Sequence, residues 1–178
     1  TMWLSATFVA KSWIIQDKAL REGIEIHFDL SAEEFYNNHT LTLKKQGKSI
    51  SYTREFFFRI YEAAYSHKAG RTIYATDTAG NLHGALFVIW NKECAYDLIS
   101  TLDPDYRTSG ASSLLIYEMI KFLSDEGIKV FDFEGSMIPG VEESFRHFGA
   151  RQTPYFLIWK NYGSNVEIWV DKVKRRLF

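Results

Sequence analysis

The spacing of apolar residues along the chain predicts an alternation of helices and strands. Apolar residues that recur every three to four positions indicate a helix, and apolar residues that alternate with polar ones indicate a half-buried strand. The first half of the chain is therefore expected to form a helix, a strand, two helices and three strands, over residues 12–21, 24–30, 32–45, 54–68, 72–76, 84–90 and 95–102. Ser31 with Glu34 makes a capping box for the helix at 32–45. Thr53 caps the next helix, which we expect to stop at Gly70.

The second half of the chain begins where an apolar strand meets Pro104. Proline has no backbone N–H to donate, so the strand is expected to end there, and Ser109 is the expected N-cap of the following helix. Gly127 is the expected stop of that helix. Beyond it the pattern predicts a strand, a short helix and a terminal pair of strands, over residues 129–133, 141–148, 155–159 and 166–170.

The composition indicates a single packed domain over residues 1–178. Apolar residues make up 46% of the chain and aromatic residues 16%, which is enough to build one sizeable core. The net charge of -1 gives no general attraction to nucleic acid, and the scattered histidines show no metal-ligand spacing. Cys94 is the only cysteine, and no apolar run approaches the ~20 residues that span a bilayer. We therefore expect a cytoplasmic protein without membrane insertion.

The segment from Arg107 to Ser112 carries the strongest functional signal in the sequence. Small residues at the start of a helix leave backbone N–H groups free at the positive end of the helix dipole, where a phosphate can bind without a dedicated cation. Gly110 has no Cβ, so a ligand can approach closely, and Ala111 keeps the first turn small. An ordinary connection between a strand and a helix has the same composition, so this segment alone leaves both interpretations open.

A resemblance to a known superfamily follows from the wider pattern Leu102-x-Pro104-x-Tyr106-Arg107-x-x-Gly110-x-Ser112. It resembles the acyl-CoA pyrophosphate signature of the GNAT acyltransferases, although Ser112 stands where Gly or Ala is usual. The resemblance implies an α/β (α+β) fold with a mixed, mostly antiparallel central sheet flanked by helices. It also implies an acyl-CoA co-substrate, acetyl-CoA by default, and no metal. The donor-binding residues that it implies are Leu102, Arg107, Thr108, Ser109, Gly110, Ala111 and Ser112.

A second block of residues narrows the resemblance to one branch of the superfamily. The runs Phe131-Asp-Phe-Glu-Gly-Ser-Met-Ile-Pro-Gly140 and Phe145-Arg-His-Phe-Gly149, with Lys44-Lys-Gln-Gly47, are similar to the Fem-type aminoacyl transferases of peptidoglycan cross-bridge synthesis and their uncharacterised relatives. Such proteins resemble two GNAT-type domains in tandem. We therefore also consider that this domain is the C-terminal half of a longer tandem protein. The branch implies aminoacyl-tRNA as an alternative donor and a cell-wall precursor as its acceptor.

Acyl transfer to an amine also needs a group that moves protons, and the sequence leaves its identity open. GNAT enzymes often place a tyrosine four residues before a glycine in the short helix, but here Phe145 precedes Gly149 at that spacing. The candidate catalytic residues nearby are Glu134, Ser136 and Tyr106, with Asp132 and Tyr155 as further neighbours.

Asp132 and Glu134 are expected to lie on one face of a strand, because they are two residues apart. Repulsion between the two carboxylates would raise the pKa of one of them into a range useful for a base. In the alternative interpretation, one carboxylate caps the following turn and the other pairs with Arg146 or Arg151.

Three functions fit these observations. The first is an N-acyltransferase that uses acyl-CoA and a small-molecule or peptide amine. The second is a Fem-like transferase that depends on aminoacyl-tRNA. The third is a GNAT-like domain that binds a ligand or partner without catalysis.

Overall fold

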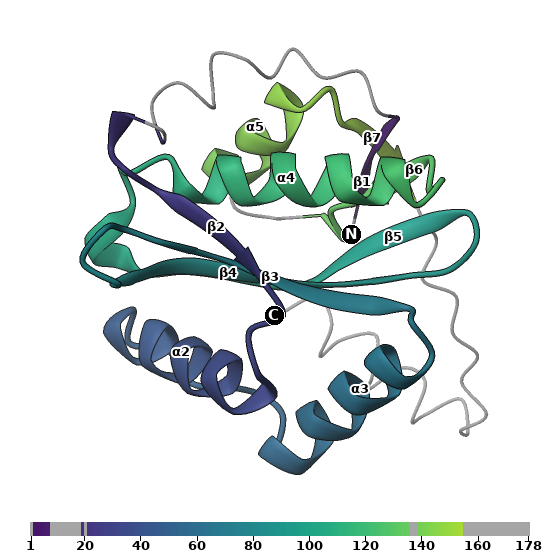
Figure 1. The fold of residues 1–178 in the computed structure, drawn as a ribbon. Helices are drawn as coiled ribbons and strands as arrows, with labels where there is room; N and C mark the ends of the chain where they lie inside the picture. The colour runs from purple at the N-terminus through teal and green to yellow at the C-terminus, as the bar shows by residue number, and fades with distance from the viewer. Residues whose placement is uncertain (1, 8–18, 20, 136–138, 155–178) are drawn as a thin grey trace, which may run out of the picture.

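One mixed sheet of seven strands organises the molecule, in the order β2-β3-β4-β5-β6-β1-β7 (Figure 1). The computed structural model describes residues 2–7, 19, 21–135 and 139–154. Within these residues every neighbouring pair of strands is antiparallel except β5 and β6, which run parallel. The strands are β1 (Met2–Thr7), β2 (Glu25–Phe28), β3 (Gly70–Thr76), β4 (Leu82–Trp90), β5 (Cys94–Leu102), β6 (Val130–Asp132) and β7 (Arg151–Pro154).

Helices cover both faces of this sheet. They are α2 (Ala32–Lys45), α3 (Arg54–Ser66), α4 (Ala111–Asp125) and α5 (Pro139–His147), and a short 3-10 helix, η1 (Pro104–Tyr106), leads from β5 towards α4. In Figure 1, α2 and α3 lie below the sheet, whereas α4 and α5 lie above it. This arrangement confirms the expected mixed, mostly antiparallel sheet flanked by helices.

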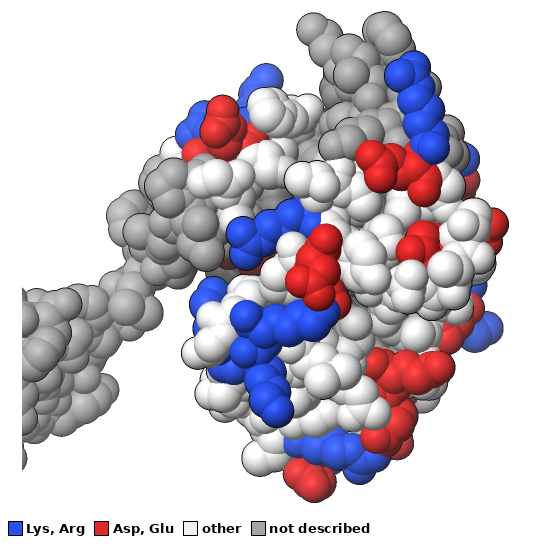
Figure 2. Space-filling view, turned by 90° about the vertical axis from the view of Figure 1, so that its left-hand side faces the viewer, with Lys and Arg blue, Asp and Glu red and all other residues white. Residues whose placement is uncertain are grey.

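The end of α2 and the connection into α4 meet on one side of the molecule. Lys45, the last residue of α2, forms ion pairs with Asp103 and Asp105, and its Nζ lies 2.6 Å from a carboxylate oxygen of each. These ion pairs link the helix layer below the sheet to the segment that enters the helix above it. Figure 2 looks onto this side and shows Lys and Arg side chains gathered near its middle, with acidic residues around them.

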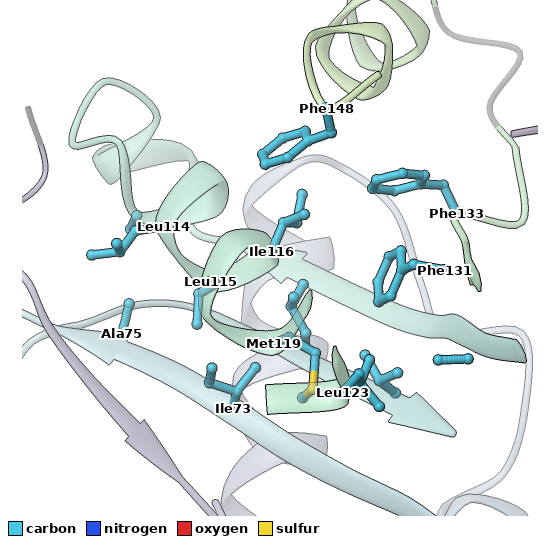
Figure 3. Packing of buried hydrophobic residues seen from close by; sticks show 14 of the residues in the cluster. Ile73, Ala75, Leu114, Leu115, Ile116, Met119, Leu123, Phe131, Phe133 and Phe148 are labelled. Carbon is cyan, nitrogen blue, oxygen red and sulfur yellow. The ribbon is translucent and has the colours of Figure 1, made fainter. Parts of the chain in front are cut away.

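A buried stripe along α4 packs onto the upper face of the sheet (Figure 3). Leu115, Met119 and Leu123 are fully buried and recur at every fourth residue, so they share one side of the helix. The same cluster contains Ile73 of β3 and Phe131 of β6. The cluster therefore fixes α4 over the centre of the sheet.

A second core, made mainly of aromatic rings, holds α2 and α3 against the lower face. Phe57 of α3 is 1% exposed, and its ring centroid lies 5.5 Å from that of Phe35 on α2 and 5.9 Å from that of Phe87 on β4. The pKa of Tyr52, which lies beside these rings, is raised to about 12 by burial. The layer below the sheet therefore depends on rings from both helices and from the sheet.

Both expected helix caps before α2 and α3 are present, but the end of α3 differs from the prediction. The helix ends at Ser66, and Gly70 is the first residue of β3 rather than a helix stop. A Cβ at Gly70 would lie 2.6 Å from that of Ala64. The glycine is therefore needed because the backbone passes close to α3.

The start of α4 also corrects the prediction. Gly110, rather than Ser109, is the N-cap, and its φ of 80° lies in the left-handed region that glycine adopts readily. The Ser109 Oγ instead accepts a hydrogen bond from the Ala111 N–H at 3.3 Å. Ser109 thus still accepts a hydrogen bond from an N–H of the helix start, but it lies one position before the N-cap and is not the N-cap itself. At the other end, Gly127 follows the helix with a φ of 84°, as predicted.

Two strands at one side of the sheet, β1 and β7, were not expected from the apolar pattern. β1 lies between β6 and β7 and pairs with both. The strands expected at 155–159 and 166–170 lie outside the described residues. So does most of the helix expected at 12–21, of which Ala19 and Arg21 are described and are helical.

Candidate functional site

The candidate site lies where β5 separates from β6. The two strands pair over three residues of each, and the last pair is Tyr96 with Asp132, where β6 ends. β5 continues to Leu102 and remains paired with β4 along its other side. Within the described residues, the last part of β5 therefore has one backbone edge without a partner strand.

A cleft of about 620 Å³ occupies this opening. Its walls come from the end of β5, the first turns of α4 and one side of α5, and the segment after α2 reaches its edge. This volume is typical of sites for small molecules and cofactors. The polar residues and glycines of the lining include Gln46, Lys48, Ser100, Thr101, Arg107, Gly110, Ser112, Ser113, Gly140 and Ser144.

The residues that the sequence suggested for donor binding divide into two groups. Those that line the cleft are Leu102, Arg107, Gly110 and Ser112. Those outside its lining are Thr108, which is exposed, and Ser109 and Ala111, which are buried. The hydrogen bond from the Ala111 N–H to the Ser109 hydroxyl supports the start of α4. These two residues therefore contribute to the site by holding the backbone of the helix start in place.

The first turn of α4 forms one wall of the cleft. The Leu114 N–H donates to the Gly110 carbonyl, which is the first hydrogen bond of the helix. Ser112 and Ser113 line the cleft, and their N–H groups lie in the turn where the helix itself supplies no carbonyl acceptor. Together with the positive end of the helix dipole, these donors suit a phosphate group.

Two exposed cations, Lys48 and Arg107, also line the cleft. In the part of the chain that the structure describes, neither has an ion-pair partner. Nearby Lys45 is different, because Asp103 and Asp105 neutralise it. The cleft therefore presents positive charge that can pair with an anionic ligand. Lys48 was not among the residues that the sequence suggested, since only its place after α2 brings it here.

A bulge in β5 brings two polar side chains together beside the cleft. The pairing of β5 with β4 passes from Asp97 directly to Ile99 and leaves Leu98 as an extra residue. The Ser100 Oγ lies 2.7 and 2.6 Å from the two Asp97 carboxylate oxygens. Sequence reasoning missed this pair, although a carboxylate inside an apolar strand was a signal that could have pointed to it.

Asp97 is buried, and this burial raises its pKa to about 6. The hydrogen bond from Ser100 acts in the opposite direction and lowers the pKa, whereas the negative charge of Glu134 raises it further. Burial also raises the pKa of Glu134 and of Asp132, and for Glu134 the charge of Asp132 adds to the effect. Three carboxylates with raised pKa values therefore lie on neighbouring strands or just after them.

Asp132 and Glu134 do not share a strand face in the expected way. β6 ends at Asp132, and Glu134 follows with a φ of 54°, in the left-handed region. Its backbone N–H donates to Asp132 Oδ1 at 2.8 Å, so Asp132 caps the turn. The alternative interpretation also paired the other carboxylate with Arg146 or Arg151, but neither pair is present among the described residues, and Arg146 contacts Glu142 and Gln152 instead.

Of the other catalytic candidates only Tyr106 is described, and it is not among the residues that line the cleft. Tyr106 stacks on His83 with ring centroids 3.8 Å apart, which directs its ring against β4. Ser136 and Tyr155 lie outside the described residues. Phe145 does line the cleft and stacks on Phe133 at 4.4 Å, so the position where related enzymes often have a tyrosine is an apolar wall.

The same described ranges contain neither a cluster of metal ligands nor a membrane-spanning helix. No group of three or more His, Cys, Asp or Glu side chains there could hold a metal ion. No described helix is long and apolar enough to cross a membrane.

Comparison with known proteins places the fold. A family model for the acetyltransferase (GNAT) domain matches residues 16–149, and no curated protein matches the sequence. The structure of FemX is similar with a TM-score of 0.72 and 11% identity, over 85% of this chain and 59% of the FemX chain. This protein thus spans about three fifths of the length of FemX.

Two smaller proteins are similar over nearly their whole length. Glucosamine-6-phosphate N-acetyltransferase from Arabidopsis thaliana has a TM-score of 0.57 and 13% identity, over 79% of this chain and 99% of that one. AAC(6')-Iy, solved with a bisubstrate analogue of CoA and acetylneamine, has a TM-score of 0.60 and 12% identity, over the same shares. Because the family model matches most of the chain, the resemblance seen in the sequence is confirmed: the chain belongs to the acetyltransferase (GNAT) domain family.

Proposed function

We propose that this protein transfers an acyl group from acyl-CoA, acetyl-CoA by default, to the primary amine of a small molecule or peptide. The observation that carries the proposal is the cleft at the open edge of β5, with the start of α4 as one wall and the cations Lys48 and Arg107 in its lining. The diphosphate of the donor would bind at the helix start, where backbone N–H groups and both cations favour it. Ser112 adds a small hydroxyl that can donate to a phosphate oxygen.

The open edge of β5 is suited to the reacting end of the donor. As the amine nitrogen bonds to the thioester carbonyl carbon, the carbonyl oxygen becomes negative and needs hydrogen-bond donors. The backbone between Ser100 and Leu102 has no strand partner on its cleft side in the described residues and can supply them. The carbon–sulfur bond then breaks, CoA leaves as a thiolate that takes up a proton, and the product is an amide.

A second donor, aminoacyl-tRNA, follows from the Fem-type resemblance. The observation that favours it is the similarity to FemX, which extends over 85% of this chain. In this reading the chain acts with a further domain, and the acceptor is an amine of a cell-wall precursor. The aminoacylated 3′ end of the tRNA would enter the same cleft, so the two donors would compete for one site.

Coenzyme A is expected to raise the melting temperature of the protein. A ligand at about 100 times its dissociation constant adds ~2.7 kcal/mol to the free energy of unfolding, which corresponds to roughly 5–10 °C for a domain of this size. Calorimetry with CoA, acetyl-CoA and pantetheine measures the effect. Pantetheine lacks the diphosphate, so its shift is expected to be much smaller. If neither CoA nor acetyl-CoA moves the melting temperature, the proposed donor is wrong.

Release of the CoA thiol then tests transfer itself. Acetyl-CoA is mixed with neamine, glucosamine 6-phosphate or a lysine-containing peptide, and amide formation is checked by mass spectrometry. Binding of CoA without turnover of any amine would favour the non-catalytic interpretation. Transfer from charged tRNA, with no effect of CoA on stability, would favour the second donor.

Arg107→Ala is expected to weaken CoA binding about tenfold, which corresponds to about 1.4 kcal/mol. The reason is that Arg107 lines the cleft as an exposed cation, and a charged hydrogen bond to phosphate is lost with it. Titration calorimetry measures the dissociation constant. Lys44→Ala is the matched control, because Lys44 is a cation at the end of the neighbouring α2 that does not line the cleft. Equal losses in both variants would show that the general charge of this side, not Arg107, binds the donor.

A further inference from the structure

The bulge of β5 places an ionisable group, the Asp97 carboxylate, beside the cleft. The Ser100 hydroxyl lies between this carboxylate and the cleft and hydrogen-bonds to it. In an unbroken strand Asp97 and Ser100 would point to opposite faces, because they are three residues apart. The extra residue, Leu98, changes this, since Asp97 lies opposite Val88 and Ser100 lies opposite Leu86. Both of these β4 residues belong to the core on the α4 side. The two polar side chains therefore lie on the same side of the sheet as the cleft.

The two side chains differ in their access to the cleft. Asp97 is 7% exposed, whereas Ser100 is exposed and lines the cleft. The Ser100 hydroxyl donates to the Asp97 carboxylate at 2.6 to 2.7 Å. A hydroxyl has one proton and two acceptor lone pairs, so this donation leaves its oxygen able to accept a proton from the cleft.

We propose that Ser100 is a catalytic residue that accepts the proton of the acceptor amine, and that Asp97 is the positioning residue that draws this proton onward. This inference rests on the proposed function. As the amine nitrogen bonds to the thioester carbon, its proton passes to Ser100 Oγ, and the Ser100 proton passes to the Asp97 carboxylate. The departing thiolate then takes one proton, and Asp97 becomes ionised again.

The surroundings of Asp97 suit a group that takes up and returns a proton. On this face β4 contributes Leu86 and Val88, and α4 contributes apolar side chains to the same core. The charged groups near Asp97 in the described chain are Glu134 and, beside Glu134, Asp132, both after or at the end of β6. Burial and the charge of Glu134 raise the pKa of Asp97 to about 6, so it is mostly ionised at neutral pH and still basic enough to take a proton.

Ser100→Ala is expected to lower kcat about 100-fold, the usual contribution of a positioned base, without changing CoA affinity. The probe is the amine from neamine, glucosamine 6-phosphate or the lysine peptide that the wild type acetylates. CoA affinity is measured by titration calorimetry. Ser100→Thr keeps a hydroxyl at the same position and is expected to retain most of the rate. Loss of CoA affinity with an unchanged kcat would overturn the proposal and make Ser100 a donor-binding residue.

Asp97→Asn is expected to lower kcat by a similar factor and to change the pH profile. In the wild type kcat falls as the pH is lowered through about 6, because Asp97 becomes protonated. The variant is expected to lose this fall, which a merely structural role of Asp97 would not produce. Burial disfavours the ionised carboxylate, so the neutral amide is expected to leave the protein folded. Matched controls are Ser124→Ala and Asp125→Asn, at the far end of α4 from the cleft.

Different results would contradict the proton path through Ser100 and Asp97 and the proposed acyl transfer itself. If the wild type acetylates an amine and both Ser100→Ala and Asp97→Asn keep its kcat, the proton path is wrong and the proposed function stands. If the wild type binds CoA but acetylates none of the three amines, the proposed reaction is rejected and the proton path with it.

Discussion

Phe57→Ala is expected to lower the free energy of unfolding by about 3 to 5 kcal/mol, the usual cost of removing a buried aromatic ring. Phe57 is 1% exposed at the centre of the aromatic core. The rings around it are those of Phe35, Tyr36, Tyr52, Phe58, Tyr61 and Phe87. These rings come from both helices and from the sheet, so they cannot all move inward to fill the cavity. Unfolding in guanidinium, followed by circular dichroism, measures the loss from the midpoint at a constant m-value.

Phe56→Ala is the matched control for this prediction. Phe56 is the adjacent residue on the same helix, has the same side chain and is 47% exposed. Its removal is expected to lower the free energy of unfolding by no more than about 1 kcal/mol, because much of the ring already contacts solvent. Equal losses for the two variants would show that α3 does not depend on the central ring.

The elements that the sequence predicted well are those whose signals are local. The capping box of Ser31 and Glu34 lies within the first turn of one helix, and the stop at Gly127 directly follows another, and both are present. β1 and β7 carry no such signal. They are short, and they become strands because β1 pairs with β7 and with β6 across most of the length of the chain. Pairing of this kind leaves no periodic pattern in the sequence.

The same distinction explains the candidate site. Gly110 and Arg107 could be predicted because a helix start and its preceding turn are local features, and both residues line the cleft. The pairing of Asp97 with Ser100 could not be predicted, because the bulge is a property of the register between β4 and β5. Tyr106 was suggested by its closeness to Arg107 in sequence, but the turn of η1 places its ring on His83.

The proposed catalytic group lies away from the position where the family pattern would place it. Phe145 occupies the position at which related enzymes often have a tyrosine, and it packs on Phe133 beside the cleft. The polar pair proposed here comes instead from β5, where Ser100 lines the cleft and hydrogen-bonds to the buried Asp97. A general acid for the departing thiolate is needed less than a base for the amine, because a thiolate is a good leaving group. The loss of the tyrosine is therefore compatible with transfer from a thioester.

Gly110→Val is expected to abolish CoA binding while the protein stays folded. Gly110 has a φ of 80° and lines the cleft, and a Cβ there would lie 3.3 Å from that of Ala19. Valine places branched carbons on the wall where the diphosphate is proposed to approach the backbone N–H groups, and it strains the N-cap that orients them. The rise in melting temperature with CoA, roughly 5–10 °C for the wild type, is expected to disappear in this variant.

Gly127→Val separates a blocked cleft from a strained helix. Gly127 follows the other end of α4 with a φ of 84°, and no described atom lies within 4 Å of an ideal Cβ there. Both variants therefore carry a similar backbone strain of about 1–2 kcal/mol, but only Gly110→Val adds carbon atoms beside the cleft. Gly127→Val is expected to melt earlier than the wild type and to keep the full shift with CoA. If Gly110→Val keeps that shift as well, the diphosphate does not bind at the start of α4. If both variants lose it, α4 has become disordered, and the bound donor depends on the whole helix rather than on close approach at Gly110.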